Sequence, residues 1–130
     1  MQHQSSYRVG RGFTVIELLV VLAAIALLLS IAAPRYVAHL DAARETALRQ
    51  DLRAMRDAID KFHGDQGRYP AALEELATRR YLRAVPEDPV TQRTDTWVLV
   101  PPPHASSGAV YDVRSGAPGQ ARDGSAYASW

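Results

Sequence analysis

The chain has 130 residues, about the size of one domain. Its 15 lysines and arginines are nearly balanced by 14 aspartates and glutamates, for a formal net charge of +1, so no strong field favours nucleic acid or an anionic surface. The sequence has no cysteine, which excludes a disulfide framework and any thiolate metal site. Stability therefore has to come from packing or from assembly with other chains.

Residues 13–33 form an apolar run, FTVIELLVVLAAIALLLSIAA, in which Glu17 is the only ionisable side chain. As a helix rising about 1.5 Å per residue, the run reaches roughly 30 Å, the thickness of a bilayer core. Arginines but no acidic residue precede it, and this bias predicts that residues 1–12 lie in the cytoplasm and that the chain beyond Ala33 lies across the membrane. The sequence thus predicts a protein that crosses the membrane once.

Glu17 is costly in hydrocarbon without a partner, although near the cytoplasmic edge it can also snorkel towards the headgroups. The string GRGFTVIELL at residues 10–19 resembles the class III signal of type IV pilins and type II secretion pseudopilins. The resemblance implies that a prepilin peptidase removes residues 1–12 by cutting after Gly12 and methylates the new amine of Phe13. It also implies that this amine, on a neighbouring subunit, pairs with Glu17. At about 4 Å and an effective dielectric near 20, such a pair is worth roughly 4 kcal/mol before desolvation is subtracted.

A second interpretation treats the same run as a secretory signal peptide. Ser30 and Ala32 are small residues in the spacing that signal peptidase accepts, and cleavage after Ala32 would release a periplasmic domain. However, the run is longer than the ~7 to 15 residues of a signal-peptide core, it contains Glu17, and Pro34 follows the cut. These features favour a retained membrane helix.

Residues 34–63 are predicted to extend the membrane helix as a periplasmic stem. Pro34 lacks an N–H and crowds the carbonyl four residues back, so a helix running through it is expected to be locally kinked or weakened; the alternative is that Pro34 only marks the bilayer surface. In the resembled family, a proline here coincides with a stretch that can melt and extend within the filament. Glu45 and Arg49, four residues apart, suit the exposed face of the stem as an ion pair.

Apolar residues at alternating steps of four and three form one stripe along the stem. Its members are Leu48, Leu52, Met55, Ile59 and Phe62. The stripe predicts packing against a C-terminal lobe, and a coiled-coil seam is the alternative.

Residues 64–130 are predicted to form that small lobe. Glycines and a proline end the long helix, residues 71–79 predict a short helix, and two prolines force an extended loop over residues 81–89. Strands are predicted at Thr96–Val100, at Ala109–Val113 and near Tyr127–Trp130. We therefore expect an α+β, pilin-like fold, in which a long N-terminal transmembrane-and-stem helix packs against a small C-terminal antiparallel sheet.

Several lobe segments resemble the major, G-type pseudopilin of type II secretion: residues 67–70 (GRYP), residues 81–89, Trp97 and residues 111–130. The resemblance implies a structural subunit of a periplasmic pseudopilus that supports type II protein secretion. Its implied partners are further copies of the chain in a helical filament, minor pseudopilins, a prepilin peptidase and an inner-membrane assembly platform. The implied location is the bacterial inner membrane, with the N-terminus cytoplasmic and the lobe periplasmic.

Members of this pseudopilin family often bind calcium in the last loop through closely spaced acids, and here residues 124–127 (GSAY) stand in their place. Asp112, Ser115 and Asp123 are the remaining oxygen donors that could hold calcium. The two aspartates can equally be turn-forming residues. No other cofactor is expected.

Catalysis finds no support in the sequence. The four histidines are scattered without a carboxylate or thiol at ligand spacing, and neither a zinc-protease helix motif nor a Gly-x-Ser-x-Gly elbow occurs. We therefore expect a protein that is not an enzyme. Two alternatives to the pseudopilin stay open: a minor or major pilin of a type IV pilus, and a monomeric periplasmic binding module that is anchored or secreted.

Overall fold

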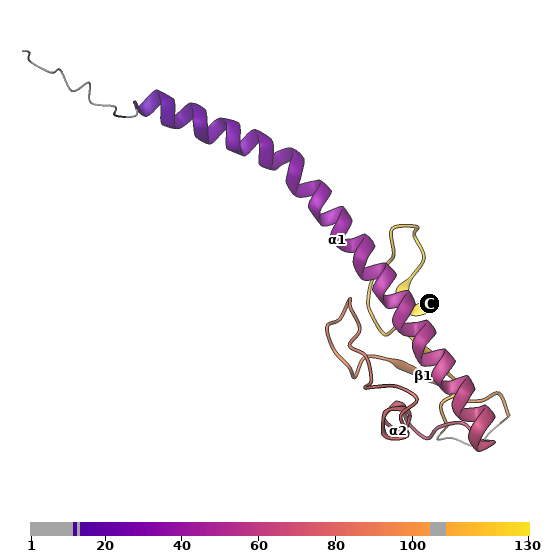
Figure 1. Ribbon diagram of the computed structural model, residues 1–130. Helices are drawn as coiled ribbons and strands as arrows, with labels where there is room; N and C mark the ends of the chain where they lie inside the picture. Colours follow the sequence, from indigo (N-terminus) through magenta and orange to yellow (C-terminus); the bar gives the residue numbers. More distant parts are fainter. Residues whose placement is uncertain (1–11, 13, 105–108) are drawn as a thin grey trace, which may run out of the picture. The chain divides into compact units, whose positions relative to one another are not determined.

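The computed structural model describes residues 12, 14–104 and 109–130. The chain divides into two compact units, one ending at Ala38 and the other running from His39 to Trp130. One helix, α1 (Val15–Gln66), contributes to both units. The elements that follow are α2 (Leu73–Thr78), β1 (Val98–Val100), β2 (Asp112–Arg114) and a 3₁₀ turn, η1 (Tyr127–Ser129). Figure 1 labels the helices and β1 along the chain.

In the first unit, α1 begins at an N-cap. The hydroxyl of Thr14 accepts a hydrogen bond from the backbone N–H of Glu17 at 3.1 Å, which satisfies one of the donors that a helix start leaves free. Pro34 lies inside the helix, and α1 continues through it without a break. The helix therefore runs through this proline, as expected from the sequence, and the adjoining Ala- and Leu-rich turns sustain it on both sides.

Within the described residues, α1 is the helix long and apolar enough to cross a membrane, with a mean hydropathy of 2.9 over its best window. Every side chain of this window is exposed. The helix satisfies its own backbone hydrogen bonds, which is what a lipid-exposed segment requires. Length and composition thus agree with the predicted membrane helix.

In the second unit, the predicted apolar stripe faces the core. Leu48, Met55, Ile59 and Phe62 have no exposed surface and Leu52 keeps 2%. The stripe packs on buried residues of the lobe, which are Leu73, Leu76, Trp97, Val110 and Val113. The prediction of intramolecular packing is confirmed.

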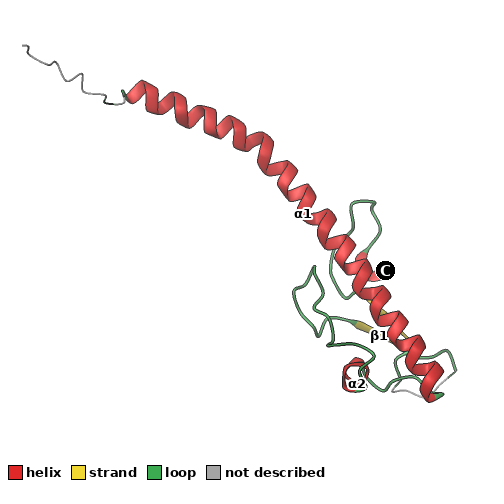
Figure 2. Cartoon of the chain, viewed as in Figure 1, coloured by secondary structure: helices red, strands yellow, loops and turns green. Residues whose placement is uncertain are grey.

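The helix α1 ends at Gln66, because Gly67 adopts a left-handed conformation (φ 69°) and its N–H turns back to the carbonyl of His63 at 2.9 Å. Beyond it, α2 lies within the short helix predicted at residues 71–79, and it buries Leu73 and Leu76. Loops and turns, green in Figure 2, make up most of the described chain after residue 66.

The two strands form an antiparallel pair, in which Val98 lies opposite Arg114 and Val100 opposite Asp112. The architecture is α+β, as predicted. Both strands are shorter than expected, and β2 starts later because the N–H of Val110 donates to Pro70 instead of to the strand (2.8 Å).

The predicted third strand is wrong. Residues 127–129 form the 3₁₀ turn η1, in which the N–H of Trp130 donates to the carbonyl of Tyr127 and that of Ser129 to Ala126, both at 3.0 Å. The hydroxyl of Ser129 donates to the same Ala126 carbonyl at 2.6 Å. These local hydrogen bonds outweigh the β-propensity of Tyr127 and Trp130.

Candidate functional site

The predicted processing and assembly residues lie at the start of α1. Gly12 is exposed, with nothing within 4 Å of where a side chain would begin, so the backbone there is open. Phe13 lies outside the described residues. Glu17 is exposed in the first turn of α1, and Pro34 is exposed further along the same helix. The structure therefore keeps Glu17 and Pro34 on one helix, and among the described residues neither side chain forms a hydrogen bond or an ion pair.

Within residues 12, 14–104 and 109–130, the carboxylate of Glu17 forms no ion pair and no hydrogen bond, whereas its backbone N–H donates to the hydroxyl of Thr14. The surrounding surface is apolar: Ile16 is 73% exposed and Leu18 55%. A carboxylate on such a surface is costly in lipid, so its partner has to come from outside the described chain.

The apolar surface of the first unit continues along the helix. Exposed large apolar side chains recur from Val15 to Val37, and Leu28 is 66% exposed near the middle. An apolar surface of this extent needs lipid or other protein to cover it. The first unit is therefore a membrane or assembly segment and not part of a water-soluble core.

In the second unit, the C-terminal loop is fastened to the stem by Glu45. This carboxylate is 8% exposed and accepts hydrogen bonds from the backbone N–H of Arg122 (2.7 Å) and from its Nε (3.2 Å). The expectation that Glu45 pairs with Arg49 on the exposed face is wrong, because the last loop folds back over this turn of α1 and supplies a nearer partner. A buried acid bound to a distant loop has no signal in the local sequence.

Arg49 contacts the same loop. Its guanidinium lies 4.1 Å from the centre of the Trp130 ring, a cation–π geometry, and 3.8 Å from a carboxylate oxygen of Asp123. The indole N–H of Trp130 donates to the hydroxyl of Ser125 at 2.9 Å. Glu45 and Arg49, one helical turn apart, thus bind the two ends of the closing loop, residues 122–130, at Arg122 and Trp130.

The three candidate calcium donors have separate partners. Asp112 accepts a hydrogen bond from Arg56 at 2.9 Å, and the hydroxyl of Ser115 donates to Asp88 at 3.0 Å. Asp123 accepts from the N–H and hydroxyl of Ser125 at 2.9 and 2.6 Å, and these bonds hold its pKa below the ordinary value. Among the described residues, no three acidic or histidine side chains gather as a metal site. Calcium binding stays a prediction.

Sequence reasoning did not identify Asp88, which has no exposed surface. Its carboxylate accepts hydrogen bonds from the N–H groups of Val90 (2.8 Å) and Thr91 (3.3 Å) and from Ser115. This pattern is a turn built by an aspartate side chain, and the Asp-Pro pair at residues 88–89 is the signal that could have indicated it.

The segment that contains the Asp88 turn is hydrogen-bonded to the residue before β1, and Asp88 lies near Asp51 of the stem. The indole N–H of Trp97, next to β1, donates to the carbonyl of Pro86 at 2.8 Å. Partial burial, and then the charge of Asp88, raise the pKa of Asp51 on α1. The segment at residues 81–89 therefore has a structural role, because its hydrogen bonds connect it to residues beside β1 and β2.

Comparison with known proteins gives one family motif and several relatives. The prokaryotic N-terminal methylation motif matches residues 8–33. The type II secretion system core protein G of Pectobacterium carotovorum subsp. carotovorum is 30% identical over 117 residues, which cover 78% of this chain and 73% of that protein. The protein of the same name from Klebsiella michiganensis is 30% identical over 61% of this chain and 67% of its own length. That of Pseudomonas aeruginosa is 31% identical over 50% of this chain and 46% of its own. No solved structure matches.

Proposed function

The chain belongs to the family of the type II secretion system core protein G, and from that membership we infer that it is a structural subunit of the pseudopilus, the filament of type II protein secretion. The relatives are structural subunits and not enzymes, which fits the lack of catalytic motifs in the sequence. The methylation motif runs directly into a helix that can cross a membrane. This junction is the observation that carries the assignment.

Glu17, which has no partner for its carboxylate among the described residues, supports assembly through the N-terminus. Cleavage after Gly12 creates a positive amine on Phe13, and Glu17, four residues later, is the one acid in the apolar run. Pairing of that amine with Glu17 of a neighbouring copy would remove the cost of an isolated carboxylate in lipid. The exposed apolar segments, residues 13–33 of each copy, would then pack against one another in the core of the filament, with the lobes outside.

The family membership and the charges before the apolar run also suggest where the chain lies and which proteins it binds. We place the N-terminus in the cytoplasm, residues 13–33 in the bacterial inner membrane and the chain beyond Ala33 in the periplasm, since arginines and no acids precede the apolar run. The expected partners are further copies of the chain, minor pseudopilins, a prepilin peptidase and an inner-membrane assembly platform. Pro34 would let the stem bend or extend under load.

The mature N-terminus tests this function. The chain is produced together with its prepilin peptidase, extracted from membranes, and its intact mass and first residue are measured. We expect a chain that begins at a methylated Phe13. A chain that begins at Ala33 would mean a secreted soluble domain, and the filament function would have to be abandoned.

A further inference from the structure

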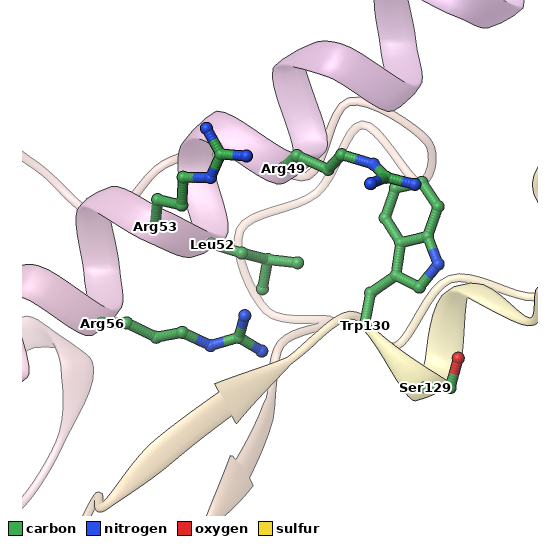
Figure 3. A pocket seen from close by; sticks show the side chains of 6 residues that line it. All are labelled: Arg49, Leu52, Arg53, Arg56, Ser129 and Trp130. Carbon is green, nitrogen blue, oxygen red and sulfur yellow. The ribbon is translucent and has the colours of Figure 1, made fainter.

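A pocket of about 360 Å³ opens between α1 and the end of the chain in the second unit. Figure 3 shows three arginine side chains from α1 along one side of it, Leu52 between them, and the indole of Trp130 across the space. We call this space the arginine pocket. The residues that line it are Arg49, Leu52, Arg53, Arg56, Ser129 and Trp130.

The three arginines are neighbours on the surface of α1. Arg53 follows Arg49 by four residues and precedes Arg56 by three, and side chains at these spacings have Cβ atoms about 5–6 Å apart. Like charges at such spacings destabilise a helix. An anion bound among the three guanidinium groups would remove this repulsion.

Two of the guanidinium groups have N–H donors to offer. Arg53 is exposed and, within the described part of the chain, its side chain forms no hydrogen bond and no ion pair. The guanidinium of Arg49 lies 3.8 Å from a carboxylate oxygen of Asp123, which is too long for a hydrogen bond, and it packs on the ring of Trp130. Each guanidinium carries five N–H donors in a fixed fork, so both arginines can bind oxygen atoms of a ligand.

Arg56 is engaged on one side. Its Nε donates to Asp112 at 2.9 Å and one of its terminal nitrogens donates to the carbonyl of Val113 at 3.0 Å. Among the described residues, no acceptor binds the other terminal nitrogen. Two carboxylates, those of Asp112 and Asp123, lie beside three arginines, which leaves one positive charge in the pocket. A cleft with one sign of charge and an apolar wall concentrates anions.

The shape of the donor set favours a phosphate group over a carboxylate. Guanidinium forks match both anions, with two parallel hydrogen bonds each. A carboxylate has two oxygens, which one fork satisfies, whereas a phosphate group has at least three and can accept from more than one arginine. A volume of about 360 Å³ lies at the small end of ligand pockets, so the ligand is a small molecule.

We propose that the arginine pocket binds the phosphate group of a small soluble molecule, with Arg53 and Arg56 donating to its oxygens and Arg49 adding a third positive charge. Trp130 and Leu52 provide the apolar part of the wall. This site goes beyond the proposed filament function and does not depend on it, because all of its residues belong to the second unit of a single copy.

Calorimetric titration with inorganic phosphate tests the site in the full chain. The chain is solubilised in an uncharged detergent at pH 7, and sodium chloride holds the ionic strength constant. We expect one phosphate per chain with a dissociation constant of about 1 mM or below. Acetate should bind at least about tenfold more weakly, because it engages one fork. The proposal is overturned if phosphate does not bind, or if acetate binds as tightly.

Arg53→Gln removes the charge and the fork that have no partner in the described chain, and it should weaken phosphate binding about tenfold or more. Arg83→Gln is the matched control, because it makes the same change at an exposed arginine that does not line the pocket. It should leave the phosphate affinity within about twofold of that of the unsubstituted chain. Both variants should keep the melting temperature to within about 3 °C, since both residues are exposed. Equal phosphate affinities of the two variants would overturn the proposal.

Discussion

Glu45 is expected to stabilise the lobe by holding the C-terminal loop on the stem. Glu45→Ala removes the acceptor of the Arg122 backbone N–H at 2.7 Å and the partner of its side chain at 3.2 Å. A hydrogen bond to a charged group is worth about 1.5 to 3 kcal/mol, and the ion pair adds ~0 to 1 kcal/mol because the Arg122 side chain is 58% exposed. We expect a loss of about 2 to 3 kcal/mol, or roughly 10 to 20 °C in the melting temperature of a domain of this size.

The assay is thermal unfolding of the detergent-solubilised full chain, followed by tryptophan fluorescence. The chain has 2 tryptophans, and they report on different places: Trp97 lies in the core and Trp130 on the loop that Glu45 holds. Glu45→Gln keeps an acceptor for the backbone N–H and should lose about half as much stability as Glu45→Ala. Glu74→Ala, which removes an exposed acid of α2, should change stability by ~0.5 kcal/mol or less.

A melting temperature for Glu45→Ala within about 3 °C of the unsubstituted chain would refute this reasoning. It would mean that the closing loop is held by the packing of Trp130 and Arg49 and not by the buried acid. A loss of the same size in Glu74→Ala would likewise show that the effect is not specific to the loop.

Four further predictions follow. Glu17→Ala should be cleaved and methylated normally but form filaments at least about tenfold less well, because the amine of the neighbouring copy loses its partner; normal filament yield would contradict the assembly role. Burial and Asp88 raise the pKa of Asp51, so the folded state binds more protons than the unfolded state, and stability should fall as pH rises above about 4. Asp51→Asn should therefore raise the melting temperature at pH 7, with a gain that shrinks towards zero below about pH 4; an equal gain at both would speak against the raised pKa. Gly116→Ala should destabilise the lobe by about 2 kcal/mol or more, because the added methyl group would overlap the backbone carbonyl of Thr96, and an unchanged unfolding temperature would exclude that close approach. Calcium held by the last loop should raise the melting temperature in a way that a chelator reverses, and a melting temperature that calcium leaves unmoved would end that hypothesis.

The elements that the sequence predicts well depend on short-range patterns. The apolar run at residues 13–33, the stripe from Leu48 to Phe62 and the stop at Gly67 all follow from helix period, side-chain type and glycine conformation. The N-terminal motif is contiguous as well, which is why residues 10–19 are enough to indicate how the chain is processed and assembled. Each of these features requires only neighbours within a few residues.

Only the tertiary structure shows which contacts hold the C-terminal loop on the stem in the second unit. Glu45 and Arg122 are 77 positions apart, and only the return of the last loop to the stem turns an apparently exposed acid into a buried one. Trp130 likewise closes a local 3₁₀ turn and covers Arg49 instead of extending the sheet. The arginine pocket exists for the same reason, because its walls come from α1 and from the end of the chain. Hydrogen bonds and contacts between distant segments leave no periodic pattern in the sequence, so they appear only once the loop has folded back.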